Sequence, residues 1–331
     1  MSLPKVVQAI RRHRRFLVAA HVNPEPDALG SALALAGLLR RLGKSVTVLN
    51  DGGTPEGLAW LPGSDRVLAT WRGPVRAEVS ITVDVPVFGR LGSAGPVLRR
   101  APFLISIDHH VSHGGFGDLN WVDPSAAATG EMIYRLFRAM RVTPSPADAL
   151  CMYAALVIDT GSFKYRNTTP VVHEIAADLL RRAKINPLYV SQRLYETHRA
   201  SDLRLLGEVL RGLRTTPDGR VAWVEVPRAI VRRAGPELID ELVNYPRSIR
   251  TAEVAMALRE RPTAGEVRIS LRSKGTVDVD MIARAFGGGG HLAASGCTIH
   301  GTLAQARTRL LAEIRRHLPA TRSHGRPARR R

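Results

Sequence analysis

The tripeptide Asp108-His109-His110 is the clearest chemical signal in this chain, and it directly follows the apolar run 103–107. A buried strand that ends in a carboxylate and two imidazoles carries three groups that bind divalent metals. Open α/β folds keep their sites at this carboxyl edge of the sheet. Two adjacent histidines after an aspartate make a poor core, so the pattern favours a functional site. Asp108 itself is expected to orient a neighbouring imidazole through a hydrogen bond.

Three further segments share this pattern of an apolar element, then acidic or histidine residues, then a turn of small residues. They are the segment 21–27 after the run 16–22, Asp84 after the run 79–83, and Asp159, which precedes a Thr-Gly turn. Taken singly, each has a structural interpretation as a helix cap or a turn. Taken together, their carboxylates and imidazoles at successive sheet edges predict a two-metal hydrolytic centre.

Individual residues in these segments suggest individual roles. Asp27 precedes a helical pattern and is expected at its N-cap, where free N–H groups keep a carboxylate ionised. Gly30 and Ser31 are small enough to let the backbone approach a ligand. Asp84 suits a bridge, because two carboxylate oxygens can hold two cations about 3.5–4 Å apart. Arg90 could contact a phosphate, although an ordinary surface arginine is the alternative.

The alternation of apolar runs with helical patterns indicates the fold class. In the first half, strands are expected at 16–22, 46–49, 79–83 and 103–107, and helices at 28–42, 129–140 and 147–157. Short apolar strands separated by helices predict a doubly wound, mainly parallel α/β domain. In the second half, strands are expected at 220–226, 253–259, 267–272 and 296–300, and helices at 236–243, 280–286 and 303–317. This second pattern predicts a smaller mixed α/β domain.

These patterns also give domain boundaries. The expected parts are a catalytic domain at 1–187, a helical linker at 188–211, a substrate-binding domain at 212–320 and a basic disordered tail at 321–331.

A run of glycines directly precedes His291 in the second domain. The members that we expect to contact substrate are Gly288, Gly289 and Gly290. Glycine backbone can approach an anion closely and offer it converging N–H donors. The alternative is a flexible hinge, although hinges are seldom followed by an imidazole between a helix and a strand. Upstream, Arg272 and Ser273 are expected to add a bidentate phosphate clamp and a hydroxyl donor.

Composition limits the class of protein. The chain has 48 basic and 29 acidic residues, a formal net charge of +19, which fits a polyanionic substrate or simply an arginine-rich coding bias; both interpretations stay open. Two cysteines without a CxxC partner fit a reducing compartment. No apolar run reaches the roughly 18 residues of a membrane span. We therefore expect a cytoplasmic protein that does not enter the membrane.

Taken together, these motifs resemble those of the DHH/DHHA1 phosphoesterase family. The matching segments are HVNPEPDALGS at 21–31, Asp84 with Arg90, DHH at 108–110, DTGSF at 159–163, and RSKG with GGGGHLAASG within 272–296. The chain length and the single carboxy-terminal domain are most similar to the nano-RNase branch of that family. The resemblance implies a DHH domain, a DHHA1 domain and an active site in the cleft between them.

The resemblance also implies ligands, substrates and a mechanism. One Mn²⁺ would be held by His21, Glu25 and Asp84, and the other by Asp27, Asp84, His109 and Asp159. His110 would lie near the reacting phosphate, while Arg272 and His291 would grip the substrate. A metal-held hydroxide would attack phosphorus. The implied substrates are very short single-stranded RNAs, linear dinucleotides such as pApA, and 3′-phosphoadenosine 5′-phosphate, and a homodimer is implied as well.

One ligand position departs from the family pattern. Residue 25 is glutamate where the family usually has aspartate, and its extra methylene changes its reach by about 1.5 Å. We expect Glu25 still to bind metal, while Pro26 replaces the usual glycine and stiffens the turn. Two alternatives are an inorganic pyrophosphatase, which the GGGGH motif opposes, and a catalytically weakened nucleotide- or RNA-binding protein. Glu25 alone supports the latter, and the matching ligand positions oppose it.

Overall fold

The computed structural model describes residues 2–234, 241–261 and 265–319. The chain divides into two compact units, Met1–Thr197 and His198–Arg331. Most of the helix expected at 236–243, and all of the tail expected at 321–331, lie outside the described residues.

The N-terminal unit is built on a six-stranded parallel sheet with the strand order β3-β2-β1-β4-β5-β6. Its strands are β1 (Arg15–Ala19), β2 (Ser45–Leu49), β3 (Val67–Leu68), β4 (Val79–Val83), β5 (Phe103–Asp108) and β6 (Leu119–Val122). The winding direction reverses between β1 and β4, which pair with Val18 opposite Ile81. Doubly wound sheets bind ligands at the carboxyl ends of the strands at this switch point.

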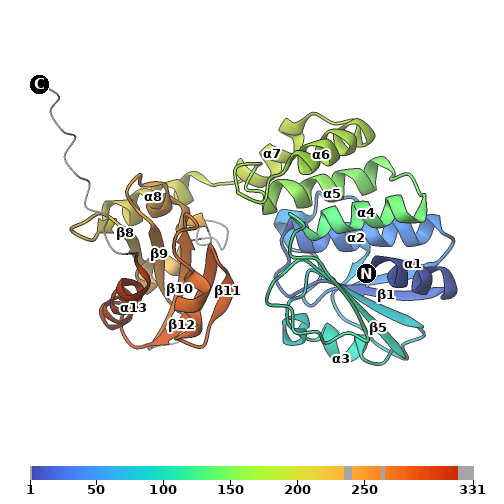
Figure 1. The fold of residues 1–331 in the computed structure, drawn as a ribbon, viewed down its shortest axis with the longest axis horizontal. Coiled ribbons are helices and arrows are strands. Elements are labelled where there is room, and N and C mark those ends of the chain that lie inside the picture. Colours follow the sequence, from blue (N-terminus) through green and yellow to red (C-terminus); the bar gives the residue numbers. More distant parts are fainter. Residues whose placement is uncertain (1, 235–240, 262–264, 320–331) are drawn as a thin grey trace, which may run out of the picture. The chain divides into compact units, whose positions relative to one another are not determined.

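Helices cover both faces of this sheet (Figure 1). Helices α2, α4 and α5 share a core with one face, and α3 packs on the other. The α-helices are α1 (Leu3–Arg12), α2 (Pro26–Arg41), α3 (Ala94–Leu98), α4 (Thr129–Met140), α5 (Pro146–Asp159), α6 (Pro170–Ala183) and α7 (Pro187–Tyr195). Three 3₁₀ turns are η1 (Glu56–Leu58), η2 (Ser64–Arg66) and η3 (Phe88–Leu91).

Helices α2 and α5 pack closely because α2 carries glycines at the contact. A Cβ added to Gly30 would lie 2.7 Å from the carbonyl oxygen of Cys151, and one added to Gly37 would overlap the side chain of Asp148. Asp148 in turn closes the capping box of α5 with Ser145. Gly30 therefore serves helix packing, and the expectation that it lets the backbone approach a ligand is wrong.

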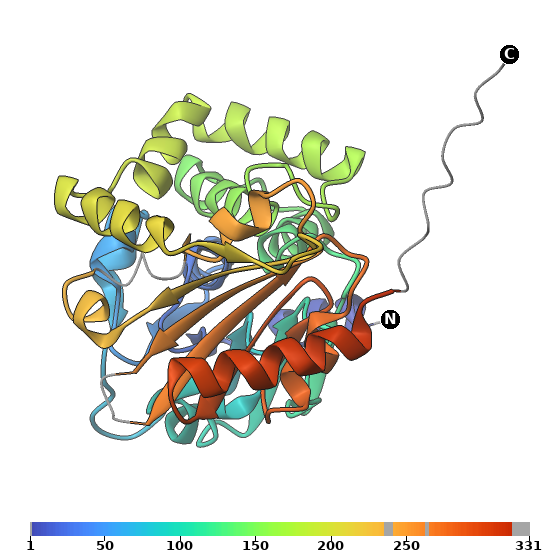
Figure 2. The ribbon, with the colours of Figure 1, turned by 90° about the vertical axis from the view of Figure 1, so that its left-hand side faces the viewer.

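The C-terminal unit has a mixed six-stranded sheet with the order β11-β12-β10-β9-β8-β7 (Figure 2). Its strands are β7 (Arg214–Thr215), β8 (Val221–Val226), β9 (Val254–Glu260), β10 (Glu266–Ser273), β11 (Gly289–His291) and β12 (Ala294–His300). Strands β8 and β9 are parallel, and the other neighbours are antiparallel. Helices α12 and α13 share a core with one face, and α8, α9 and α11 with the other. These helices are α8 (Ala200–Arg211), α9 (Arg228–Val231), α11 (Asn244–Ser248), α12 (Val279–Arg284) and α13 (Leu303–His317).

The fold class predicted from the sequence is confirmed, with a parallel doubly wound sheet followed by a smaller mixed one. Helices α4 and α13 have the predicted bounds. Two local expectations are wrong: β1 ends at Ala19 instead of residue 22, and the glycine run contributes a paired strand. Asp159 is the last residue of α5, the helix expected at 147–157. The sequence patterns do not predict α1, β6 or α6.

The segment expected to link the domains contains two helices. Helix α7 ends at Tyr195 and α8 begins at Ala200, and the boundary between the compact units falls in the break between them. In the described part of the chain, no helix combines the length and apolar character that a bilayer span requires.

Candidate metal centre

The predicted metal ligands of the N-terminal unit come together at the carboxyl edge of its sheet. Ligand atoms lie within 4.8 Å of one another in each of three sets: His21, Glu25 and Asp84; Asp27, His109 and Asp159; and Asp84, His109 and His110. We call the first set the open group and the second the buried group. Because the third set shares Asp84 with one group and His109 with the other, the three sets form one continuous cluster.

Asp84 lies at the middle of the cluster, directly after β4, and its side chain is 1% exposed. Its Oδ1 is 3.6 Å from His109 Nε2 and 3.5 Å from His110 Nδ1. Its Oδ2 is 3.6 Å from His21 Nε2 and, although buried, accepts no hydrogen bond in the described structure. A carboxylate whose two oxygens face different imidazoles has the geometry that a bridging metal ligand needs.

The backbone and the charge state of Asp84 also fit a metal ligand. Its φ of 59° lies in the left-handed region, which aspartate and asparagine tolerate better than most residues. The hydroxyl of Thr129 donates to Oδ1 at 3.0 Å. Burial opposes ionisation, but the close approach of the His21 imidazole and the charges of His110 and His109 outweigh it and hold the pKa of Asp84 below its usual range.

Asp27 is fully buried and is held by the N-terminus of a helix other than its own. The N-cap of α2 is Glu25, and Asp27 is the second helical residue, so the prediction that Asp27 caps α2 is wrong. Its two oxygens accept hydrogen bonds from the N–H groups of Thr129 and Gly130, each at 2.8 Å, and from Ser31 Oγ at 3.1 Å. The carboxylate therefore lies at the positive end of α4.

Thr129 and Gly130 were not among the predicted site residues. A Cβ added to Gly130 would lie 2.5 Å from the Cβ of Ala155, so glycine lets the start of α4 lie against α5 while its N–H reaches Asp27. A Thr-Gly pair at the start of a predicted helix was the available signal, because such N–H groups need acceptors. Nothing in the sequence indicates that the acceptor lies 102 residues away from Thr129.

The buried group is completed by His109 and Asp159. The Nδ1 of His109 lies 3.2 Å from the carbonyl oxygen of Ala126, an acceptor that leaves Nε2 directed at the carboxylates. Nε2 is 3.1 Å from Asp159 and 3.8 Å from Asp27. Burial opposes the charged imidazole, but the hydrogen bond to Asp159 and the surrounding carboxylates raise the pKa of His109 to about 11. Burial, followed by repulsion from Asp84 and Asp159, raises the pKa of Asp27.

The open group differs because one of its members faces solvent. His21 Nδ1 lies 2.8 Å from the carbonyl oxygen of Val22, and its Nε2 lies 4.0 Å from Glu25 Oε1. The Glu25 side chain is 51% exposed and forms no capping hydrogen bond. Desolvation, then the charges of Asp159 and Asp84, raise the pKa of Glu25 to about 7.

Arg90, Asp108 and His110 surround the ligands. The Arg90 guanidinium Nη2 lies 3.2 Å from His21 Nδ1. Asp108 is fully buried; its Oδ1 lies 2.8 Å from His110 Nδ1 and accepts hydrogen bonds from the N–H groups of His109 and His110. Burial opposes the charged imidazole of His110, but this contact with Asp108 raises the pKa of His110.

The turn after α5 is tied to the segment before α4. Asn167 Nδ2 donates to the carbonyl oxygens of both Asp159 and Ala127, each at 3.0 Å. Asn167 therefore holds Asp159 near the α4 terminus that binds Asp27. Asn167 was not predicted, because an asparagine in a polar turn gives no sequence signal of such a contact.

The predicted substrate-binding residues of the C-terminal unit lie on neighbouring strands. Arg272 of β10 and His291 of β11 both pair with Ala294 of β12, so they flank it on one face of the sheet. Ser273 is buried, and its hydroxyl donates to the carbonyl oxygen of Leu292 at 3.5 Å.

The glycine segment is partly bonded within its own unit. Gly288 N–H donates to the carbonyl oxygen of Ala283 at 2.9 Å, and Gly290 N–H donates to Asp280 Oδ1 at 2.7 Å. Gly289 pairs with Gly296 in the β11–β12 ladder. These bonds hold the segment as an edge strand next to His291.

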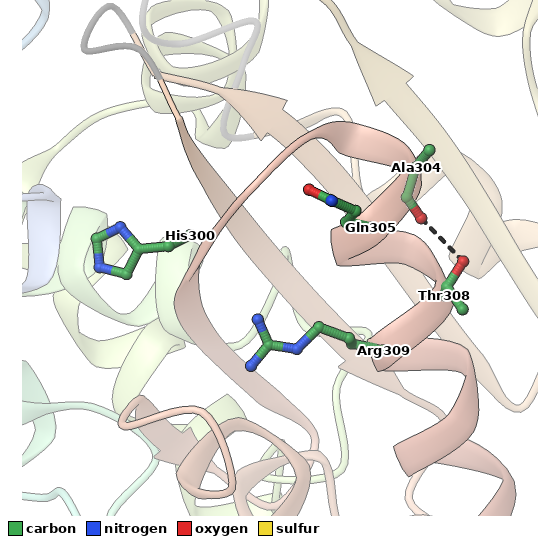
Figure 3. Close-up of a pocket in the computed structure, with 5 residues that line it drawn as sticks. All are labelled: His300, Ala304, Gln305, Thr308 and Arg309. Carbon is green, nitrogen blue, oxygen red and sulfur yellow. Dashed lines mark hydrogen bonds between the residues drawn. The ribbon is translucent and has the colours of Figure 1, made fainter.

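A hollow of about 510 Å³ lies elsewhere in the C-terminal unit, between the end of β12 and α13 (Figure 3). It is lined by His300, Ala304, Gln305, Thr308 and Arg309. Its one ionic side chain is a single arginine beside one imidazole, and it contains no carboxylate. This donor set suits neither a divalent metal nor a hydrolytic reaction.

The donor set of the cluster fits divalent cations. Carboxylate oxygens and imidazole nitrogens together suit Mn²⁺ and similar ions. The buried carboxylates of Asp27 and Asp84 lie close enough to repel each other, and Asp84 Oδ2 has no hydrogen bond. Cations would relieve both conditions.

Comparisons with known proteins agree with this geometry. Residues 15–156 match the DHH family, N-terminal domain, and residues 228–318 match the DHHA1 domain. The chain is 33% identical over 311 residues to the bifunctional oligoribonuclease and PAP phosphatase NrnA of Thermus thermophilus, covering 91% of this chain and 89% of the relative. It is 28% identical over 307 residues to NrnA of Bacillus subtilis, covering 89% and 93%.

A solved structure shares the whole fold. An exopolyphosphatase-related protein from Bacteroides fragilis superposes with a TM-score of 0.87 at 27% identity, covering 95% of this chain and 96% of that one. The family matches span both units, and the relatives align over nearly their whole length. The chain therefore belongs to the DHH phosphoesterase family and is a hydrolase that acts on phosphoester bonds.

Proposed function

We propose that this protein is a Mn²⁺-dependent phosphoesterase that hydrolyses very short single-stranded oligoribonucleotides and linear dinucleotides such as pApA. We also propose that it removes a phosphate from 3′-phosphoadenosine 5′-phosphate. The relatives named for these two activities align with 28–33% identity over about nine-tenths of the chain. Their names supply the substrate class, and the Asp84 cluster supplies a site with suitable chemistry.

The observation that carries the proposal is the position of Asp84 between the open and buried groups. Its two oxygens face His21 on one side and His109 on the other, within 3.6 Å. We propose that the open group holds one cation, that the buried group holds a second, and that Asp84 contacts both. Two such cations would neutralise charge on a phosphate and lower the pKa of a bound water.

The protein's own residues would orient and hold the substrate. His110, fixed by Asp108, is positioned to hydrogen-bond or protonate an oxygen of the reacting phosphate. Arg90, next to His21, can bind a phosphate oxygen from the N-terminal unit. In the C-terminal unit, Arg272 and His291 lie on one sheet face and are proposed to bind substrate phosphate, with Ser273, Gly288, Gly289 and Gly290 supporting them.

Two further expectations stay proposals. Cys151 and Cys297 are buried and free, which suits the cytoplasm, where thiols remain reduced. A homodimer is proposed from the family resemblance, and sedimentation of the purified protein tests it.

A substrate panel tests the proposed activity. The metal-free protein, supplied with Mn²⁺, is assayed on pApA, pGpG, a longer RNA, 3′-phosphoadenosine 5′-phosphate and pyrophosphate. We expect mononucleotide release from the dinucleotides, phosphate release from the bisphosphate, weak action on the longer RNA and none on pyrophosphate. Phosphate release from pyrophosphate without cleavage of pApA would instead favour a pyrophosphatase.

A further inference from the structure

An exposed tyrosine lies over the turn that carries Asp159. Gly161, two residues after Asp159, has a φ of 56°, and a Cβ added to it would lie 2.3 Å from Cζ of Tyr165 and 2.5 Å from both of its Cε atoms. The ring of Tyr165 therefore rests directly on the backbone of this turn. Only glycine at position 161 permits that approach.

The turn is held in an unusual conformation. Ser162 and Phe163 follow Gly161 with φ values of 59° and 62°, in the left-handed region that non-glycine residues rarely adopt. Hydrogen bonds fix the strained segment: Ser162 N–H donates to the carbonyl oxygen of Val157 at 2.8 Å, and Tyr165 N–H to that of Thr160 at 2.9 Å. Strain that is held in this way concentrates at functional sites. Here it fixes the backbone from which the Tyr165 ring projects.

The surroundings of the ring match the chemistry of a nucleotide. Tyr165 is 38% exposed, and its two chain neighbours, Lys164 and Arg166, are exposed as well. Within the described ranges, the side chains of Lys164 and Arg166 form no hydrogen bond or ion pair. Exposed aromatic rings near cationic side chains are the combination that proteins use to bind single-stranded nucleic acid, with bases stacked and phosphates attracted.

We propose that Tyr165 is a stacking platform for a nucleobase of the bound substrate, and that Lys164 and Arg166 attract its phosphates. The inference rests on the proposed function and adds the part of the N-terminal unit that distinguishes nucleotides from other phosphoesters. Because the ring lies on the turn that begins at Asp159, a base stacked on it places the attached phosphate next to the buried group.

A cycle between ring and base tests the contact. The ring is removed with Tyr165→Leu, and the base is removed by using pApA analogues in which one nucleoside or the other is abasic. Equilibrium binding to the metal-free protein and the KM with Mn²⁺ are both measured. We expect Tyr165→Leu to weaken pApA binding about tenfold, within the range found for base stacking. One abasic analogue should bind the parent protein about tenfold more weakly than pApA does. With the Tyr165→Leu variant, that analogue and pApA should bind with equal affinity.

The ring itself is tested by Tyr165→Phe, which should restore most of the affinity that Tyr165→Leu loses. The charge contribution is tested by the paired change Lys164→Ala and Arg166→Ala, which should lower the salt dependence of binding. Arg181→Ala on α6 is the matched control, because that side chain is 73% exposed and lies outside the turn. It should leave binding unchanged.

The outcomes separate the two proposals. If the parent protein does not cleave pApA, the proposed function fails, and the metal-free binding cycle still decides the role of Tyr165. The stacking platform is refuted if removing the ring and removing the base weaken binding independently for both abasic analogues. It is also refuted if Tyr165→Leu binds pApA as tightly as the parent.

Discussion

The open group contains Asp84, which also faces His109 of the buried group, but the two groups are built differently. In the buried group, Asp27 is enclosed by two backbone N–H groups and a hydroxyl. In the open group, Glu25 is half exposed and held by no capping bond. The first arrangement is fixed by the fold before any cation arrives, while the second must order a flexible side chain, which costs up to about 2 kcal/mol. We therefore expect two cations to bind with unequal affinity, the tighter one in the buried group.

Asp84→Asn should have the largest effect because Asp84 serves both groups. Asparagine keeps the shape and tolerates the φ of 59°, but it lacks the charge. Turnover of pApA should fall by more than about a thousandfold, as is common when a member of a concerted catalytic set is removed. The measurements are single-turnover cleavage and metal content.

The control for this change is Asp65→Asn, since the Asp65 side chain is 77% exposed in the same unit. Thermal unfolding should show that both variants are folded. Near-normal cleavage by Asp84→Asn with both cations bound would mean that the two groups act without a shared ligand.

Gly130→Ala should damage the buried group more than the open group. The added Cβ would meet Ala155 at 2.5 Å and push the start of α4 away from α5, and with it the N–H groups that hold Asp27. Overpacking of this kind costs about 1–3 kcal/mol of stability. Loss of the Asp27 donors should weaken the tighter cation about 10–100-fold, as other supporting contacts of metal ligands do.

Gly207→Ala in α8 is the matched helix control, because a Cβ there meets nothing within 4 Å. It should be neutral or slightly stabilising. Calorimetric titration with Mn²⁺ follows both sites, and equal weakening of the two would contradict the separate construction of the groups.

The contrast between the groups also shows how far the sequence could predict the site. Ligands that follow apolar runs were found, because carboxyl ends of parallel strands share one edge and hydrophobic periodicity locates those strands. The donors to Asp27 were not found, because the N-terminus of α4 is brought to Asp27 by tertiary packing across 102 residues. The sequence pattern likewise could not predict the exposure of Glu25, because that exposure depends on how the side chain projects from the start of α2.

The C-terminal unit gives the same lesson about the fold. Its strands β8, β9 and β10 were predicted within a residue or two, because their buried faces alternate or run apolar. No strand was expected in the glycine run, and glycine has low β-propensity. The run forms β11 because it pairs with β12. Residue propensities describe the run alone and cannot predict that pairing.

The pH dependence of Mn²⁺ binding should differ between the groups. Without metal, the pKa of His109 is raised to about 11 and that of Glu25 to about 7. Both therefore carry a proton at pH 6, whereas only His109 does at pH 8. Cations displace these protons, so affinity should rise with pH, by about tenfold per unit for each proton released.

The sign follows from competition: lowering the pH protonates the ligands and weakens binding. The weaker cation should lose its pH dependence above about pH 7, while the tighter one keeps it. Proton release during titration with Mn²⁺ in weakly buffered solution, repeated at pH values from 6 to 8, checks both pH dependences. In Glu25→Gln the change of slope near pH 7 should vanish; a slope change that survives in that variant would assign the proton elsewhere.

The smallest effect is expected from Glu25→Asp. The reverse change in the buried group, Asp27→Glu, gives the sharpest test of the difference between the two groups. Shortening Glu25 by about 1.5 Å alters a half-exposed side chain that can adjust, so affinity for the weaker cation should change by less than about tenfold. Asp27→Glu adds the same methylene inside a closed shell of donors and should cost about 1–3 kcal/mol of stability and most of the tighter binding. Calorimetric titration of both variants compares one methylene at two sites. Equal losses of cation affinity would show that the two groups are equally rigid, because the cost of changing a side chain by one methylene depends on how far the surrounding residues can adjust.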